Sequence, residues 1–427
     1  MSNDNLNAVY DARTLGKPRM LALGVQHMFA MFGATVLVPQ LTGLSVSSTL
    51  LFAGIGTLIF HFFTKGKVPA FLGSSFAFLA GYMTIAPNGE KHLLPYACLG
   101  VACSAALYFL LAVLVKVFGV KKVMRFFPPV VTGPIIISIG LTLSQSAVDK
   151  CSRNWLVAFS AVLVIVACVI WGRGMIKIIP ILLAAVVSYV FAGILGEVDF
   201  TSVKNAAWIG LPVLKENTVF AIFENPDTSL IITSIVTIVP IAIATMMEHI
   251  GDISAISATT GNNFIKDPGL HRTLIGDGLA TAFAAAFGGP ANTTYGENTG
   301  VLELSRVYDP RVVRLAAVYA ILLSFSPKVA ECIGSLPASI IGGVSFMLYG
   351  MISAIGVRNV VENKVDFTKS RNLIVAAVIL VSGLGFGNGI TFTVAGTSIT
   401  LTSLAIAAIL GIALNAILPG KDYEFDE

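Results

Sequence analysis

Long stretches without a single charged residue are the feature that most constrains this chain. Residues 22–44, 45–63, 230–247 and 372–390 contain no Lys, Arg, Asp or Glu. A run of about 18 or more such residues is long enough to cross a bilayer as a helix. Only 12% of the chain is charged and 56% is hydrophobic, whereas soluble domains are about 25% charged. We therefore predict a membrane protein that crosses the bilayer many times.

The apolar segments can be placed in order along the chain. The first 19 residues are polar and lack an apolar signal core, so we expect a cytoplasmic N-terminal tail at 1–19 and no cleaved signal peptide. We predict fourteen segments, with a short cytoplasmic tail at 419–427. Their expected ranges are 20–40, 45–63, 68–86, 93–118, 129–147, 155–171, 176–195, 229–249, 274–287, 290–307, 312–333, 338–355, 372–387 and 397–418.

The distribution of basic residues supports this layout. With the N-terminus inside and fourteen alternating segments, 21 of the 27 Lys and Arg residues fall on the inside and 6 on the outside. Membrane proteins place basic residues preferentially on the cytoplasmic side. Omitting the short third or tenth segment would invert the loops between them and remove the bias. We therefore expect both termini in the cytoplasm and the protein in a bacterial cytoplasmic (inner) membrane.

Two interrupted segments occupy matching places in the two halves of the chain. The third runs through Pro69-Ala70 to Phe76, and the tenth through Pro290-Ala291 to Tyr295 and Glu297. We expect residues 69–76 and 290–296 to be extended and to pair as antiparallel strands, each followed by a helical run (77–85 and 298–307). Paired interruptions of this kind indicate the site of an inverted-repeat transporter. The predicted fold class is an all-α polytopic membrane protein, a 7+7 inverted repeat whose segments 3 and 10 are part strand, part half-helix.

The tenth segment carries a carboxylate at a depth where charge is costly. The run 288–300, GGPANTTYGENTG, contains Glu297 and is too polar and too rich in Gly, Pro and Thr for a lipid-facing helix. Irregular backbone at membrane depth survives only where protein or a water-filled cavity satisfies it, and an ionisable residue there is a functional-site hypothesis. The alternative is an outside loop with Glu297 in water.

The eighth segment adds two more carboxylates. Glu248 and Asp252 are four residues apart and therefore share one helical face. Mutual repulsion and burial both favour proton uptake by such a pair, as a proton-coupled site requires. The alternative places Asp252 in cytoplasmic water at the end of the helix. His249 points away from this face and is expected to be a packing residue.

Together these groups describe a site for a flat polar ring. Free amides near Phe76 and Gly296 could bind carbonyl oxygens, and Glu248 and Glu297 could accept N–H bonds. Aromatic side chains, Phe76, Tyr295 and Tyr349, could pack on the ring. A planar heterocyclic amide fits, although composition alone does not choose it over an amino acid or an anion. We find no nucleophile–base set, phosphate loop, metal-ligand spacing or nucleic-acid signal, so neither an enzyme nor a resident metal or cofactor is expected.

Six motifs resemble one transporter family. The sequence Gly296-Glu297-Asn298-Thr299-Gly300 followed by Ser305-Arg306 resembles the signature of the nucleobase–ascorbate transporters, also called nucleobase:cation symporter-2. Five further stretches are similar to that family over nearly the whole chain: Gln26-His27, Gly73-Ser74-Ser75-Phe76, Glu248-His249-Ile250-Gly251, residues 267–272 (DPGLHR) and residues 342–350 (GGVSFMLYG). The resemblance is strongest to the uracil permeases.

The resemblance implies a division into two domains and a set of site residues. Core-domain parts would be residues 20–118 and 228–333, and gate-domain parts residues 119–227 and 334–418. Glu248 and Glu297 would hold the ring nitrogens of a base, and the amides of Phe76 and Gly296 its carbonyls. The pocket would also be lined by Ala34, Tyr295, Ser345 and Tyr349. Proton coupling is expected at Glu248, Asp252 and His27.

The implied activity is import of uracil with protons by alternating access. Sodium remains open as the coupling ion, and a homodimer is expected. One departure stands out, because similar uracil permeases carry histidine where this chain has Asp252. A purine or xanthine symporter of the same family therefore remains an alternative, as does a sulfate-type anion transporter of similar fold, although two site carboxylates would repel an anion. A channel is a further alternative, which would not require the carboxylate pair.

Overall fold

The computed structural model describes residues 8–87, 89–387, 389–394 and 397–420, and they are mostly helical. The longer helices are α1 (Lys17–Thr42), α2 (Val46–Phe63), α4 (Leu94–Phe118), α6 (Pro129–Cys151), α7 (Trp155–Trp171), α9 (Pro180–Ile194), α11 (Thr228–Ile238), α12 (Ala242–Thr260), α13 (Leu270–Ala286), α14 (Gly296–Ser305), α15 (Pro310–Ser324), α17 (Ala338–Glu362), α18 (Ser370–Gly385) and α19 (Ser403–Ile417). Short helices are α3 (Leu79–Ile85), α5 (Val120–Met124), α8 (Met175–Ile178), α10 (Thr201–Asn205) and α16 (Pro327–Gly334). Four strands, β1 (Leu72–Ser74), β2 (Asn292–Thr294), β3 (Ile390–Val394) and β4 (Thr397–Leu401), form two antiparallel pairs.

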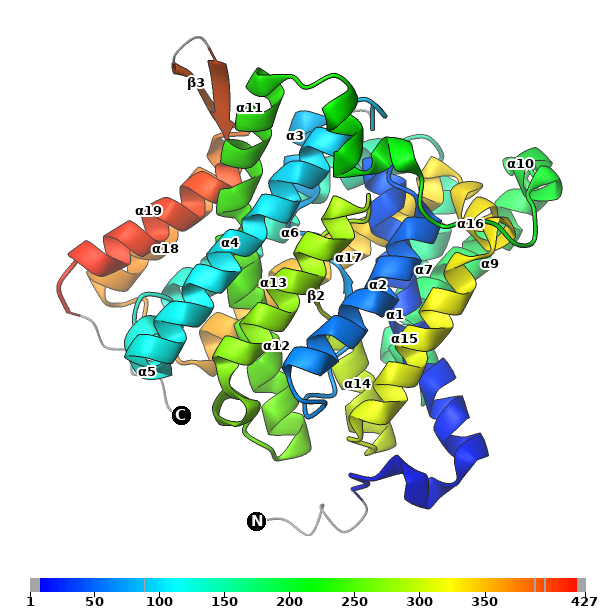
Figure 1. Ribbon diagram of the computed structural model, residues 1–427, viewed down its shortest axis with the longest axis horizontal. Coiled ribbons are helices and arrows are strands. Elements are labelled where there is room, and N and C mark those ends of the chain that lie inside the picture. Colours follow the sequence, from blue (N-terminus) through cyan, green and yellow to red (C-terminus); the bar gives the residue numbers. More distant parts are fainter. Residues whose placement is uncertain (1–7, 88, 388, 395–396, 421–427) are drawn as a thin grey trace.

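Two groups of helices build the molecule. In the first, α4, α13, α2 and α15 lie side by side in that order, and α1 packs against α15 (Figure 1). In the second, α17 packs along α6 and α7, α9 packs on α7, and α18 and α19 pack on each other and on α6. Two helices connect the groups. Helix α1 also contacts α9 and α17 of the second group, and helix α12 contacts α6 and α19 of that group.

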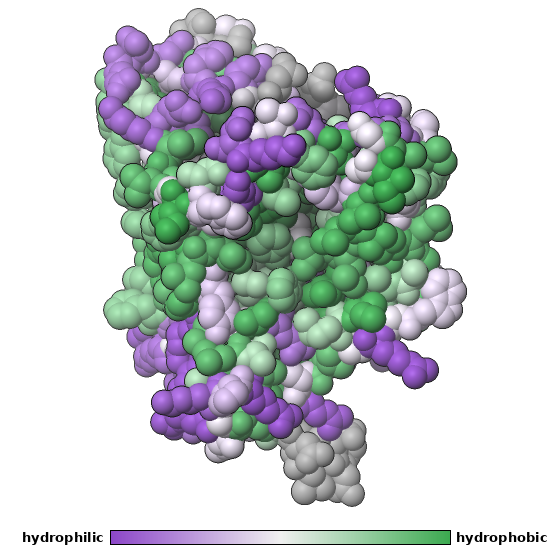
Figure 2. Space-filling view, turned by 90° about the vertical axis from the view of Figure 1, so that its right-hand side faces the viewer, coloured by the Kyte–Doolittle hydropathy of each residue, from purple (hydrophilic) through white to green (hydrophobic). Residues whose placement is uncertain are grey.

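The surface has the banding of a protein that lies in a membrane. Figure 2 shows hydrophobic side chains gathered in a belt around the molecule, with hydrophilic side chains above and below it. Among the described residues, six helices are long and apolar enough to cross a membrane, and a seventh span results if α15 and α16 count as one. Four shorter apolar helices, α7, α9, α18 and α19, accompany them. The chain is therefore a multi-pass membrane protein, as predicted.

Strands β1 and β2 cross in the interior, where the sequence predicted extended backbone. They pair antiparallel, with Leu72 opposite Thr294 and Ser74 opposite Asn292. Their outer edges are satisfied by threonine hydroxyls. Thr57 of α2 bonds the amide and the carbonyl of Leu72 (2.9 and 3.2 Å), and Thr281 of α13 does the same for Asn292 (3.2 and 2.8 Å). A buried two-stranded sheet thus has no unpaired polar edge at these positions.

The half-helices α3 and α14 leave this crossing toward opposite faces of the molecule (Figure 1). We call the face at which α14 ends, where the described chain also begins, the N-terminal face, and the opposite one the far face. Two matching hydrogen bonds show that a rotation relates the two strands: the Ser75 amide donates to the Ala291 carbonyl (2.8 Å), and the Tyr295 amide donates to the Phe71 carbonyl (3.0 Å). In this relation Ser75 is equivalent to Tyr295 and Phe71 to Ala291. The sequence match aligns Pro69-Ala70 with Pro290-Ala291 instead, which is one residue different.

Three expected elements differ from the structure. The helix predicted to end near residue 249 continues to Thr260, with a 3-10 turn (Val239–Ile241) at Pro240. The expected segment 312–333 is two helices, α15 and α16, bent by 86° before Pro327. The expected segment 397–418 begins as strand β4, which pairs with β3 in a hairpin, so the chain has strands beyond the two interrupted segments. The all-α description is therefore incomplete.

Small residues bring α6 and α17 into backbone contact. A Cβ on Gly140 would lie 2.2 Å from the Tyr349 carbonyl oxygen, and one on Gly356 would lie 2.7 Å from the Gly133 carbonyl oxygen. The described glycines therefore allow close packing between two helices of the same chain.

A short segment at the start of the described chain is fastened to the N-terminal face. In this strap, residues 9–15, Val9 pairs in parallel with Val307, and the amide of Ala12 donates to buried Asp309 (2.7 Å). Tyr10 donates to the Thr260 carbonyl at 2.7 Å and its ring lies against Tyr308. Arg311 pairs with Asp11 at 2.9 Å. Residues 9–15 of the expected polar tail therefore form an ordered element, which joins the ends of α12 and α14 to the start of α15.

Candidate functional site

Helix α14 begins at Gly296 directly after β2, which places Glu297 in its first turn. Glu297 is half-buried and Gly296 is exposed. The preceding residue, Tyr295, is buried and donates its hydroxyl to the Ser74 carbonyl at 2.9 Å. Its ring covers Gly73, where a Cβ would lie 2.4 Å from ring carbons. The crossing strands therefore fix the start of α14, whose free amides favour a hydrogen-bond acceptor.

Helix α12 brings two carboxylates to the same place. Glu248 and Asp252 lie one turn apart, both half-buried, in the part of α12 that packs against α14 and β2. Thr294 of β2 donates its hydroxyl to Asp252 Oδ2 at 2.7 Å. Glu248 lies within electrostatic range of both Asp252 and Glu297. The predicted carboxylates from two different helices are thus neighbours, and Asp252 is inside the helix rather than at its end in water.

Side chains from four segments of the chain close the site. Ala34, Phe76, Tyr295 and Tyr349 belong to one buried cluster. The rings of Phe76 and Tyr349 meet edge to face, with centroids 6.5 Å apart at 74°. Ser345 lies one turn before Tyr349 on α17, and both hydroxyls are buried without a well-formed hydrogen bond to the described residues. The predicted wall residues are therefore assembled, and they include two buried hydroxyls that lie near each other.

His27 of α1 is held by the residue that follows Glu297. The amide nitrogen of Asn298 donates to the His27 carbonyl at 3.0 Å and to its Nδ1 at 3.1 Å. Because the carbonyl can only accept, the amide orientation is fixed and Nδ1 must accept as well. His27 is therefore neutral with its proton on Nε2, which is buried and has no partner among the described residues. To carry a second proton it would have to give up the bond from Asn298 to Nδ1.

A buried pair behind the site was missed by sequence reasoning. His249 Nδ1 lies 3.1 Å from Asp277 Oδ2, and both side chains are fully buried. His249 also packs edge to face on Phe60, which agrees with its predicted packing role. The sequence assigns Asp277 no role, although a carboxylate within an apolar segment requires a partner. The need for a partner could have been inferred from the sequence. Which residue is the partner could not, because His249 lies on the preceding helix and meets Asp277 only through tertiary packing.

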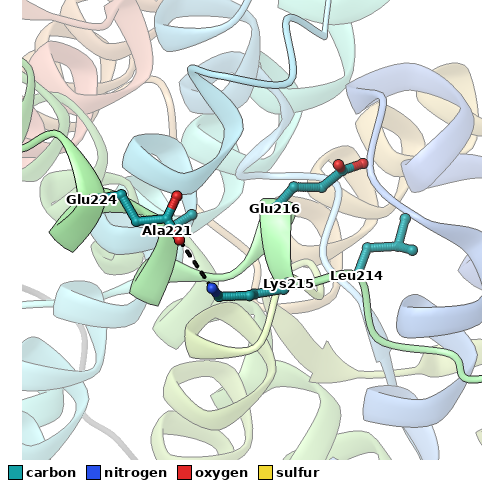
Figure 3. A pocket seen from close by; sticks show the side chains of 5 residues that line it. All are labelled: Leu214, Lys215, Glu216, Ala221 and Glu224. Carbon is teal, nitrogen blue, oxygen red and sulfur yellow. Dashed lines mark hydrogen bonds and ion pairs between the residues drawn. The ribbon is translucent and has the colours of Figure 1, made fainter.

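A pocket elsewhere on the molecule does not belong to this site. It lies in the loop between α9 and α11, on the far face, and is lined by Leu214, Lys215, Glu216, Ala221 and Glu224 (Figure 3). A surface ion pair, 2.9 Å between Lys215 Nζ and Glu224 Oε1, crosses it. Both side chains are largely exposed, so the pocket has no buried polar group to hold a ligand. Within the part of the chain that the structure describes, no group of three or more His, Cys, Asp or Glu is placed to hold a metal ion.

Comparison with known proteins gives one family and one set of close relatives. Residues 18–392 match the sequence family described as Permease family, Xan_ur_permease. The uracil permease of Bacillus caldolyticus is 41% identical over 423 residues, which is 97% of this chain and 94% of that protein. The uracil permease of Bacillus subtilis (strain 168) is 39% identical over 413 residues, which is 93% of this chain and 92% of that protein.

A more distant likeness concerns the fold alone. The transmembrane domain of a cyanobacterium bicarbonate transporter, BicA, superposes with a TM-score of 0.65 at 13% sequence identity. The match covers 89% of this chain and 98% of that domain. The architecture described above is thus one already found in a membrane transporter.

Proposed function

Because this chain belongs to the Permease family of nucleobase:cation symporters, we propose that it is a secondary transporter that imports uracil together with protons. The observation that carries the proposal is the convergence of Glu248 and Glu297, from two helices, on the start of α14 beside an aromatic wall. Relatives named uracil permease, about 40% identical over most of their length, supply the substrate class.

The topology that we propose is fourteen segments in two inverted halves of seven. The contacts between helices support it, because replacing each helix of an observed contact by its counterpart in the other half gives a second observed contact. Helix α4 packs on α13 as α15 packs on α2, and α7 contacts α17 as α18 contacts α6. The core domain would contain residues 20–118 and 228–333, and the gate domain residues 119–227 and 334–418. The two groups of helices defined above by their contacts support this division.

The base would lie in the plane that the two half-helix starts share. Glu248 and Glu297 would accept its ring N–H groups, and the amides of Phe76 and Gly296 would donate to its carbonyls. Ala34, Tyr295 and Tyr349 would pack on its faces, and the unsatisfied hydroxyl of Ser345 would bind at its edge. Hydrogen bonds to ionised acceptors are about twice as strong as neutral ones, which favours a donor-rich ring over an anion.

Protons would couple to the base through the carboxylates. Uptake of a proton by Glu248 or Asp252 lowers the negative charge around the site, so proton and base each favour binding of the other. The core domain would then move against the gate domain and expose the site to the other side. His27 takes a supporting part in this scheme, as a neutral donor held by Asn298.

The cellular setting follows from the same assignment. The N-terminal face would be cytoplasmic, because the positive-inside layout places both termini there. We place the protein in a bacterial cytoplasmic membrane and expect a homodimer. The lipid-facing surface of the gate helices carries many exposed hydrophobic side chains, including Leu163, Ile170 and Ile194.

Uptake by proteoliposomes tests the proposal. We expect labelled uracil to accumulate above equilibrium when the outside is acidic, and a sodium gradient alone to give no accumulation. Accumulation driven only by a sodium gradient would show that sodium, not the proton, is the coupling ion. Strong competition of labelled uracil uptake by excess xanthine would favour a purine or xanthine symporter.

Two further results would remove the proposal altogether. Sulfate-inhibitable uptake of an anion would place the chain with anion transporters of similar fold. Uracil flux that never exceeds equilibrium under any gradient would indicate a channel.

A further inference from the structure

The carboxylate of Asp252 is bonded to the strand that leads into the binding site. Its Oδ2 accepts the hydroxyl of Thr294 at 2.7 Å. Its Oδ1 faces Gly296, 3.9 Å from the point where a side chain on that glycine would begin. Thr294 lies two residues before Gly296 and pairs with Leu72 across the crossing. One carboxylate therefore bonds to the central strand pair and lies beside the first residue of α14.

The neighbouring residue on the same strand is not bonded in this way. Side chains alternate between the two faces of a strand, so Thr293 points away from Asp252. Its hydroxyl is buried and has no partner among the described residues. Two adjacent buried threonines thus differ in one property, the bond to the carboxylate, and provide a matched pair for experiment.

The charged groups around Asp252 are few and can be named. Glu248 lies on its own helix, Glu297 on α14, and Asp277 with its partner His249 on α13 and α12. Of the other elements packed against α12, α4 supplies Tyr108, whose hydroxyl donates to Thr245, and neither β2 nor α19 contains a titratable residue. Helix α6 carries Asp149 and Lys150 in its last turn, and the turn 265–269 after α12 carries Lys266 and Asp267, the latter paired with Lys67. The neighbours are therefore mainly acidic, and Thr294 is the hydroxyl that donates to this carboxylate.

We propose that Thr294 is a positioning residue that couples the proton on Asp252 to the amide end of α14, where the base binds. In the ionised state the hydroxyl holds the carboxylate on β2 with its second oxygen beside Gly296. The negative charge there repels a carbonyl oxygen of the base. A proton on Asp252 removes that repulsion and reverses the bond, since Asp252 then donates to Thr294. The proposal rests on the function proposed above and assigns the step that links proton to substrate.

The sign of the expected effect follows from the direction of the bond. The hydroxyl donates to the ionised carboxylate and stabilises it, so Thr294→Val makes Asp252 keep its proton to higher pH. The pH at which uracil uptake falls to half should rise by ~1 pH unit, the shift expected from one charge-assisted hydrogen bond. Uracil affinity measured at acidic pH, where Asp252 already carries its proton, should stay within about twofold of the wild type.

The test compares Thr294→Val and its control variants in proteoliposomes with the wild-type protein. Thr294→Ser should restore the wild-type pH profile, and Thr293→Val should not move it. In an Asp252→Asn background, Thr294→Val should have no additional effect on the profile, because the two groups act as a unit. If Thr294→Val does not fold, Thr294→Ala removes the same hydroxyl without adding a buried methyl group.

Two outcomes overturn the proposal. One is a wild-type pH profile in both Thr294→Val and Thr294→Ala, and the other is an equal shift in Thr293→Val. If the wild-type protein itself binds no uracil at any pH, that result refutes the proposed function and not only the role of Thr294. The two failures are therefore distinguishable in the same set of measurements.

Discussion

The two interrupted segments occupy equivalent places in the fold but have different chemistry. The first, β1 with α3, supplies backbone and aromatic groups, such as Phe76 and Phe78. The second, β2 with α14, supplies Glu297, Asn298 and the threonine that holds Asp252. Ionisable groups at the site come from the second half of the chain, apart from His27. Both segments contribute a strand to the central pair, but most of the groups that would bind ligand or protons lie on or next to the second segment, β2 with α14, which we call the second arm.

The largest effect is expected from a substitution in the second segment. Glu297→Gln keeps the shape and removes the charge, so a charge-assisted bond to a ring N–H is lost. We expect uracil affinity to fall by about 10- to 100-fold, the equivalent of about 1.5–3 kcal/mol. Binding to purified protein in detergent measures it. Glu303→Gln is the control, because Glu303 is exposed on the same helix; unchanged affinity in Glu297→Gln would refute the assignment.

The next change separates binding from coupling. Asp252→Asn removes the titrating group and keeps a side chain that can still accept the Thr294 hydroxyl. We expect accumulation against a gradient to be lost while uracil affinity changes by about threefold or less, since Asp252 has no proposed bond to the base. Uptake and equilibrium binding by the same preparation provide the two readings. Full pH dependence of uptake in the mutant would show that another group carries the proton.

A steric test probes the first segment. Gly73→Ala would place a methyl 2.4 Å from the ring of Tyr295 and 2.8 Å from the Thr35 hydroxyl. Overpacking of this kind costs about 1–3 kcal/mol, so thermal unfolding in detergent should occur at lower temperature. Gly300→Ala is the control in the second segment, because no described atom lies within 4 Å of its added Cβ. Equal stability of both variants would mean that the crossing is not closely packed.

The smallest effect concerns the strap, which is bonded to the end of the second segment and to its neighbours α12 and α15. Asp309→Ala removes the acceptor for the Ala12 amide and the N-cap of α15, at a cost of about 1 kcal/mol. We expect faster proteolysis within residues 1–15 and a modest loss of thermal stability, with uracil affinity unchanged. Protection equal to that of the wild type would show that the strap is fastened by its other contacts.

The strap also has a defined behaviour with pH. The Arg13 guanidinium holds the pKa of Asp11 well below its usual range, with a smaller effect from Arg311. Because the folded-state pKa is depressed, the contribution of Asp11 to stability is present above its unfolded-state pKa and is lost only as pH falls through the folded one. The ion pair is therefore constant in neutral and mildly acidic assays. A pH-dependent uptake profile in that range cannot arise from this pair.

Much of the site was predictable because charge inside an apolar segment is costly and visible in the sequence. Glu297, Glu248 and Asp252 stand out in this way, and glycine, proline and threonine mark the extended pieces on either side of the crossing. The hairpin β3–β4 also has a local signal, the alternation of Thr391, Phe392 and Thr393, which lies between the expected segments 372–387 and 397–418; strand β4 falls at the start of the second of these segments. These features depend on residues close together in the chain.

Other features depend on contacts between distant residues and could not be predicted. The strand register differs by one residue from the Pro-Ala match because the bonds from Ser75 and Tyr295, not the prolines, determine it. The pairing of Asp277 with His249 requires α12 and α13 to lie together. The strap has no periodic pattern, and its partners Val307 and Asp309 lie about 300 residues away, as the separation of 297 between Ala12 and Asp309 illustrates.

The attachment of the strap has a practical consequence for measuring motion. Its contacts described above reach only the ends of α12 and α14 and the start of α15. A fluorophore placed at the outer edge of this segment would consequently travel with the arm that bears Glu297. A second fluorophore at the Glu362 end of α17 would stay with the opposing helices. Energy transfer between the two dyes would then report each transport cycle without a label in the binding site.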